Sequence, residues 1–193
     1  MTFQLKRLER NSLEVQDFHD KFCKKIKYDI PTDYFNTGDC FGMYVDALLV
    51  GGFCLVDAPP LHLRSITQIQ DVLYNWHTYD KILYDACEFT GYFLDGKKFG
   101  FVFTMYLVWT VLFYRAKQFV YSYPVSHKGL ERYYGHGNPI RIHTGIPSHQ
   151  EGIKGAEREH VEVLTKWGIV KIFLCRTLRY ISWRYYERKT QRP

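Results

Sequence analysis

Several common signatures are missing from these 193 residues. The five cysteines never fall in a CxxC spacing, so the sequence indicates neither a zinc site nor a disulfide framework. The histidines show no metal-ligand spacing such as HExxH. The basic N-terminal residues are not followed by an apolar segment, so a secretory signal is not indicated. These absences favour a reduced, cytoplasmic location and no metal cofactor.

A long hydrophobic run is also missing, although one segment comes close. Residues Phe99 to Tyr114 form a run of 16 without a formal charge. A transmembrane helix needs about 17 to 25 apolar residues, and this run contains a glycine and two threonines. We therefore predict a buried helix over about 101–117 that other elements cover on every side.

Aromatic residues and local positive charge are abundant. Aromatic side chains make up 18% of the chain, which favours a ring-rich core or a broad apolar pocket. The net charge is +6, and the excess is concentrated in 166–193, which holds eight Lys and Arg against the single acidic residue Glu187. This segment therefore looks like a basic helix, either packed on the domain or lying on an anionic membrane surface.

Hydrophobic periodicity and turn residues predict an alternation of strands and helices. A Gly-containing turn after a buried strand leads into the long helix and then another strand, so these three elements predict a βαβ unit with parallel neighbours. The predicted elements are a strand 2–8, a helix 12–26, a loop 30–38, a hairpin 39–58 that turns at Asp46 and Ala47, a strand 86–94, a helix 101–117, a strand 118–125, a short helix 127–135 capped by Ser126, a last strand 140–145, and one or two basic helices within 156–189.

This element order resembles the GNAT superfamily of N-acyltransferases. The resemblance implies an α/β fold in which helices flank a mixed central sheet. It covers about residues 2–145, so we expect a GNAT-like acyltransferase domain over 1–150. Residues 151–193 would then be an added basic, helical C-terminal extension packed on that domain.

In this family the turn after the fourth strand carries a Q/R-x-x-G-x-G/A motif whose backbone N–H groups hold the pyrophosphate of coenzyme A. Free N–H groups at a helix start favour an anion. The matching run here keeps a cation and the central glycine but has valine where a small residue is usual. The resemblance implies a donor site made of Phe93, Leu94, Lys97, Lys98, Phe99, Gly100, Phe101 and Val102. The alternative is a solvated turn between strand and helix.

The family also suggests catalytic residues. A tyrosine near the end of the fourth helix protonates the leaving thiolate, and Tyr133 is the better match to that position, with Tyr134 beside it. A phenol suits this role because its pKa of about 10 keeps it protonated at neutral pH. Glu88 is the only acid within its apolar strand and is the expected base, unless it is a structural partner of Arg64. His143 on the last predicted strand is a further candidate.

We therefore expect an N-acyltransferase that moves a medium or long fatty acyl group from acyl-CoA or an acyl carrier protein thioester, with no permanently bound cofactor. The acceptor is expected to be an amine-bearing small molecule or peptide. An acidic carrier protein suits the basic surface, and the basic C-terminal helix suits a peripheral membrane contact. The alternatives are an acetyl-CoA-dependent N-acetyltransferase and a catalytically silent GNAT-like binding module. No recognised nucleic-acid-binding module is present, so nucleic acid is not an expected partner.

Overall fold

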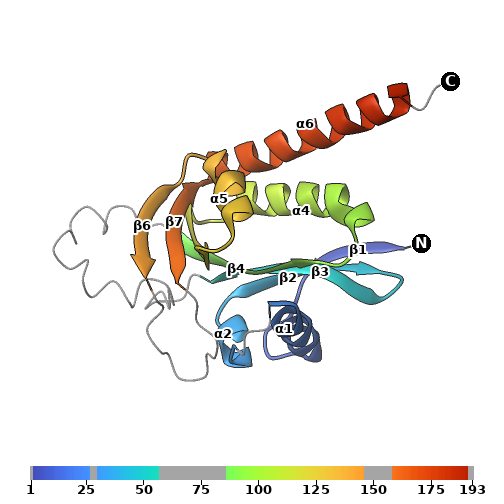
Figure 1. Cartoon of the computed structure of the whole chain (residues 1–193). Helices are drawn as coiled ribbons and strands as arrows, with labels where there is room; N and C mark the ends of the chain where they lie inside the picture. The colour runs from blue at the N-terminus through green and yellow to red at the C-terminus, as the bar shows by residue number, and fades with distance from the viewer. Residues whose placement is uncertain (1, 27–29, 57–85, 146–157, 191–193) are drawn as a thin grey trace.

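The computed structural model describes residues 2–26, 30–56, 86–145 and 158–190. Its centre is a seven-stranded sheet in the order β1-β2-β3-β4-β5-β7-β6, with β4 and β5 parallel and the other neighbours antiparallel. Helices α1 and α2 cover one face, and α4, α5 and α6 cover the other (Figure 1). The strands are β1 Phe3–Arg7, β2 Asp39–Val45, β3 Leu48–Val56, β4 Ala86–Leu94, β5 Gln118–Pro124, β6 Ile140–Gly145 and β7 Glu159–Thr165. The predicted mixed sheet with flanking helices is confirmed.

Among the described residues, two helices, α1 and α2, cover one face of the sheet, and the sequence predicted only α1. Helix α1, Leu13–Ile26, buries Val15, Phe18 and Phe22 against the sheet, as its period predicts. Helix α2, Thr32–Asn36, was predicted as loop, and that prediction was wrong. It has only five residues, so no hydrophobic period could reveal it.

The β2–β3 hairpin turns where the sequence predicts. Asp46 and Ala47 both have positive φ, at 48° and 67°. Such a pair is typical of a two-residue type I′ turn, whose twist matches that of the flanking strands. The hairpin therefore sets the register between Val45 and Leu48.

The predicted βαβ unit is confirmed by the parallel pairing of β4 and β5 across α4, Gly100–Phe113. The helix ends four residues earlier than the predicted Lys117, because Tyr114 is extended, with ψ of 150°. Lys166 Nζ then donates to the carbonyl oxygens of Leu112, at 3.2 Å, and Tyr114. The C-terminal end of α4 is the negative end of its helix dipole, so a cation at this position is also favourable.

Helix α4 is only half buried, so the prediction that it is covered on every side was wrong. Phe103, Leu107 and Val111 lie in the core. Phe101, Trp109 and Phe113 on the opposite side are 53%, 65% and 71% exposed. Among the described helices, none combines the length and apolar character needed to cross a bilayer.

The C-terminal part departs most from the prediction. Within 156–189, residues Glu159–Thr165 form β7, which lies between β5 and β6, so Ile140–Gly145 is not the last strand along the chain. Residues on both sides of position 150 therefore share one sheet. The run HVEV, residues 160–163, alternates polar and apolar residues, which is typical of a strand. The remainder forms the predicted basic helix, α6, Lys166–Thr190. The short helix α5, Lys128–Gly135, is confirmed, with His127 rather than Ser126 at its N-cap.

Candidate functional site

Strands β4 and β5 separate partway along their length. They pair only from Ala86 to Glu88 on β4 and from Gln118 to Val120 on β5. Beyond this point β4 stays paired with β3 as far as Leu94, and β5 stays paired with β7 as far as Pro124. The two halves of the sheet therefore diverge and leave backbone without a strand partner on the facing sides of β4 and β5.

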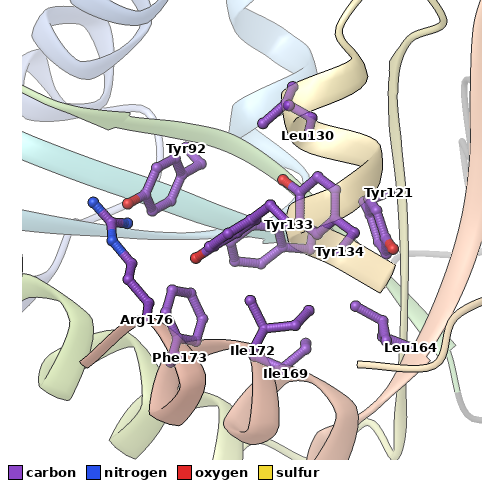
Figure 2. Close-up of a pocket in the computed structure, with 12 residues that line it drawn as sticks. Tyr92, Tyr121, Leu130, Tyr133, Tyr134, Leu164, Ile169, Ile172, Phe173 and Arg176 are labelled. Atoms are coloured by element: carbon purple, nitrogen blue, oxygen red, sulfur yellow. The ribbon is translucent and has the colours of Figure 1, made fainter. Parts of the chain in front are cut away.

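A cavity of about 390 Å³ opens at this split, on the face that carries α4, α5 and α6 (Figure 2). Strands β4, β5 and β7 and helices α5 and α6 line it. Nearly all of the lining is aromatic or aliphatic, which suits an apolar ligand. The lining residues are Phe89, Tyr92, Tyr121, Gly129, Leu130, Tyr133, Tyr134, Leu164, Ile169, Ile172, Phe173 and Arg176. None of the described α4 residues is in this set.

Both candidate tyrosines of α5 face this cavity (Figure 2). Burial raises the pKa of Tyr133 to about 12, and nearby Tyr92 adds to the effect while Arg176 opposes it. Burial also raises the pKa of Tyr134, whose ring centroid lies 4.4 Å from that of Tyr121. Both phenols are therefore protonated at neutral pH and can donate a proton or a hydrogen bond.

A buried carboxylate fixes the wall behind these rings. Glu162 on β7 is 2% exposed and accepts hydrogen bonds from Tyr121 Oη at 2.8 Å and Tyr123 Oη at 3.0 Å. Arg141 on β6 donates to Glu162 through Nε and a terminal nitrogen, at 3.0 and 2.8 Å. The charge is paired and its acceptor sites are used, so the cluster can hold the tyrosines rigidly. The sequence prediction missed Glu162 because its segment was taken as helix.

Among the described residues that line the cavity, Arg176 is the one that carries a charge. Burial lowers the pKa of Arg176, but the nearby Tyr133 and Tyr92 raise it by more, and Figure 2 shows the guanidinium close to the Tyr92 hydroxyl group. Within the described residues, no carboxylate lies within ion-pair distance of Arg176. A guanidinium has five donors in a planar fork that matches a carboxylate. The mouth of the cavity is therefore suited to an anionic group.

Glu88 lies at the last paired position of β4, where the split begins, and is 6% exposed. Its neighbours Cys87 and Phe89 pack in the core under α4, so strand alternation directs Glu88 toward the α1 face. Its negative charge helps to raise the pKa of Cys54 on that side, although burial is the main cause. Glu88 and Tyr133 thus approach the split from opposite faces of the sheet. Arg64, its suggested structural partner, lies outside the described residues.

The predicted donor turn follows directly on β4. Gly96 has φ of 87°, residues Lys97–Phe99 form a 3₁₀ turn, and α4 begins at Gly100. A Cβ at Gly100 would meet only Leu94 Cδ2, at 3.9 Å, so packing within the described chain does not require glycine there. Val102 in the first turn of α4 is 38% exposed, so its side chain does not shield this turn from solvent.

The charges around this turn favour an anion. Lys98 is exposed, with Nζ 4.8 Å from the centre of the Phe99 ring. Lys25 from α1 pairs with Asp95 at 2.8 Å and thereby offsets the acid next to the turn. Phe93 and Leu94 contribute mainly packing, since Phe93 is buried under α1 and Leu94 packs on the core under α4.

The structure therefore brings together some of the candidate residues and not others. Tyr133 and Tyr134 line the cavity. Glu88 lies where the split between β4 and β5 begins, and the donor turn follows the other end of β4. His143 lies on the edge strand β6, separated from β5 by β7, and is not in the cavity lining. The sequence prediction missed Tyr92, Tyr121 and Arg176. The alternation in QFVYSYP could have placed Tyr121 on the same face as Tyr123.

Comparison with known proteins supports this architecture. No family model matches the sequence, and no curated protein matches it. Among solved structures, it is similar to FeeM, an N-acyl amino acid synthase from uncultured soil microbes, with a TM-score of 0.58 and 15% identity over 86% of this chain and 93% of that one. An N-acetyltransferase from Staphylococcus aureus Mu50 gives 0.53 and 10% identity over 86% and 99%. Spermidine N-acetyltransferase from Vibrio cholerae, in complex with CoA and spermine, gives 0.51 and 12% over 87% and 98%.

Proposed function

The chain has the GNAT fold, and we propose that it is an N-acyltransferase. The acyl group is a medium or long fatty acyl chain, the donor is a phosphopantetheine thioester, and the acceptor is the amine of a small molecule. The observation that carries this proposal is the apolar cavity at the split between β4 and β5. An acyl chain there would replace water against aromatic and aliphatic side chains, at about 0.8 kcal/mol for each methylene buried.

The proposed reaction joins the two faces of the sheet at the split. The amine attacks the thioester carbonyl at the split, and its proton passes to Glu88 on the other face of the sheet, directly or through a water molecule. The carbon–sulfur bond then breaks, and Tyr133 protonates the leaving thiolate. A buried carboxylate is a stronger base than an exposed one. The phenol of Tyr133, whose pKa is raised, is fully protonated at neutral pH and therefore has a proton to donate. Tyr134 is the alternative acid, and His143 is a weaker candidate because of its place on β6.

The proposed donor site follows β4. A phosphate would lie at the exposed start of α4 beside Lys98, where free N–H groups favour an anion. The phosphopantetheine arm would then run along β4 past Tyr92 to Phe89. This path covers about five residues of strand, which span about 17 Å. The same site suits acyl-CoA and an acyl carrier protein, since both end in this arm. A cytoplasmic location, where such donors are made, is part of the proposal.

Arg176 favours an acceptor that carries a carboxylate. Its guanidinium lies at the mouth of the cavity, and none of the described lining residues is acidic. A polyamine would therefore meet the positive charge of Arg176 without a counter-charge from these residues, whereas an amino acid could pair with Arg176 through its carboxylate. We propose that the acceptor is an apolar or aromatic amino acid rather than a polyamine.

The proposal is tested by supplying acetyl-CoA, dodecanoyl-CoA and dodecanoyl acyl carrier protein in turn with a panel of amines. Thiol release and product mass are followed together. We expect N-dodecanoyl products and little N-acetyl product. Turnover with acetyl-CoA alone would reject the fatty-acyl donor, and donor binding without turnover would favour the silent binding module.

The catalytic roles are tested with Glu88→Gln and Tyr133→Phe. Each should lower kcat by about 10² to 10⁴ if it removes general acid–base catalysis. Tyr44→Phe is a matched control, because this tyrosine is buried on β2 outside the cavity. If both site variants keep full kcat and fold normally, the roles assigned to Glu88 and Tyr133 are wrong.

The acceptor proposal is tested with phenylalanine and its decarboxylated counterpart, phenethylamine. Wild-type kcat/KM should favour phenylalanine by about tenfold or more, because a charged hydrogen bond contributes about 1.5 to 3 kcal/mol. Arg176→Gln should abolish this preference, and Arg179→Gln, an exposed change on the same helix, should keep it. A preference that survives in Arg176→Gln would reject the assignment.

A further inference from the structure

The outward sides of α4 and α6 expose apolar side chains in a regular pattern, and the proposed reaction does not use these side chains. On α4, Phe101, Met105, Trp109 and Phe113 recur every four residues and are 52–71% exposed. This spacing places them on one side of the helix, opposite the buried Phe103, Leu107 and Val111. Trp109 and Phe113 also contact each other, with ring centroids 4.5 Å apart.

Helix α6 repeats this pattern. Trp167, Leu174, Leu178 and Ile181 are 55–74% exposed and are separated by seven, four and three residues. They lie opposite Ile169, Ile172 and Phe173, which face the cavity. The two helices are in contact and lie on the same side of the sheet (Figure 1). Each helix buries its other side in the core between it and the sheet, so both stripes point away from the sheet. We call these eight side chains the outward apolar surface.

Such a surface requires an explanation. Single exposed apolar residues are ordinary, but large contiguous patches on soluble proteins mark sites of interaction with proteins or membranes. Tryptophan is enriched where a protein meets the boundary between lipid headgroups and hydrocarbon, and this surface presents Trp109 and Trp167. None of the described helices can cross a bilayer, so a contact with lipid would be peripheral.

The charge at this surface distinguishes between occupants. Exposed Lys98 and Arg115 lie at the two ends of α4, and exposed Lys171 and Arg179 lie on α6. The sequences of α4 and α6 contain a single acidic residue, Glu187. A two-fold contact between copies would place these cations against the same cations of the partner, which is unfavourable. An anionic lipid surface satisfies both the apolar side chains and the charges.

We propose that the outward apolar surface binds the headgroup region of an anionic membrane, with α4 and α6 lying along the bilayer. The aromatic side chains enter the boundary between headgroups and acyl chains, and Lys171 and Arg179 contact anionic headgroups. This assignment can be tested independently of catalysis, because the residues changed in its test lie outside both the cavity lining and the proposed donor turn. It would also place the acyl-transfer site beside the membrane that receives an amphipathic product.

Vesicle binding tests the proposal without any substrate. The full chain is mixed with phosphatidylcholine vesicles and with mixed phosphatidylcholine–phosphatidylglycerol vesicles, and binding is measured by sedimentation and by quenching of tryptophan fluorescence with brominated lipid. We expect binding to the anionic vesicles only. The double variant Trp109→Ser/Phe113→Ser should partition at least about tenfold less.

Charge removal and a matched control complete the test. Lys171→Ala/Arg179→Ala should weaken partitioning about 30-fold, at about 1 kcal/mol for each cation. Leu13→Ser/Leu48→Ser is the control, since these side chains are 88% and 68% exposed on α1 and the β2–β3 hairpin. Circular dichroism checks that every variant is folded.

Three outcomes would overturn the proposal. The first is wild-type protein that fails to bind anionic vesicles, and the second is a control variant that loses as much binding as Trp109→Ser/Phe113→Ser. The third is a dimer, seen by light scattering, that Trp109→Ser/Phe113→Ser converts to a monomer, because the surface would then be an interface between copies.

Discussion

The cavity makes a quantitative prediction about acyl chain length. Its volume of about 390 Å³ holds on the order of a dozen heavy atoms, at about 30 Å³ for each water-sized group. Each buried methylene contributes about 0.8 kcal/mol, which is about fourfold in kcat/KM when the contact persists in the transition state. We therefore expect kcat/KM to rise about fourfold for each methylene added beyond acetyl and to level off once the cavity is full.

Filling the cavity should shorten the preferred chain. Ile172→Trp places a larger side chain on the α6 wall, where Ile172 is 2% exposed. The added bulk should exclude about two or three methylenes, so the longest donors lose about 16- to 60-fold while short donors change little. Leu130→Trp tests the same wall from α5, in case Ile172→Trp overpacks the core.

The assay measures thiol release for a series of saturated acyl-CoA donors below their micelle concentrations. Leu48→Trp is the control, because it adds the same bulk at an exposed hairpin position. A rate that does not depend on chain length would refute the reasoning. Equal losses for acetyl and dodecanoyl donors in both cavity variants would also refute it, since the effect would then be on folding or chemistry.

Three further predictions concern stability and donor binding. Gly91→Ala should destabilise the fold by about 2 kcal/mol or more, because φ is 66° and the new Cβ would lie 2.8 Å from Phe18 Cζ; urea unfolding measures this, with an unchanged midpoint as the contrary result. Glu162→Gln should cost about 1.5–3 kcal/mol, because the buried hydrogen bonds from Tyr121, Tyr123 and Arg141 lose their charged acceptor, while Glu131→Gln at the partly exposed partner of Arg141 should cost less than about 1 kcal/mol; equal effects would contradict this. Lys98→Ala should raise KM for the donor severalfold at low salt with little change in kcat, and a salt-independent KM would argue against a phosphate at this turn.

A prediction about pH follows from the buried phenols. Burial raises the pKa of Tyr106 and Tyr133 to about 12, above the ordinary value of about 10. The folded state holds these protons more tightly, so their contribution to stability is complete below pH 10 and is lost as pH rises through 12. Unfolding free energy should fall over this range, and Tyr106→Phe should reduce the slope. A slope that is the same in the variant would contradict the raised pKa.

Much of the fold was predictable because local patterns decide it. Short segments of sequence determine three of its features. These are the hairpin turn at Asp46 and Ala47, the hydrophobic period of α1, and the strand–turn–helix–strand order around Gly96. Strand β7 was missed because its alternation, HVEV, carries two polar residues that are buried, and burial of Glu162 depends on Arg141 from another strand. Helix α2 was missed because a single helical turn leaves no period.

The site was predictable in part, and the missing part is tertiary. Tyr133 could be singled out because its place near the end of a short helix resembles that of the family's tyrosine, and it lines the cavity. Arg176 and Tyr92 could not be paired from the sequence, since α6 meets β4 only across the cavity. The exposed side of α4 was also unpredictable, because an all-round apolar helix gives no sign of which side is left uncovered.

The most direct test of the central claim is the ratio of amide product to thiol released. Purified protein is incubated with dodecanoyl-CoA or the dodecanoyl carrier protein, with and without phenylalanine, and both products are quantified by mass spectrometry and thiol titration. We predict one N-dodecanoyl amide for each thiol, and no thiol release without the amine. Thiol release without amide would indicate a thioesterase. No release from a protein that binds the donor would contradict the assignment as an N-acyltransferase.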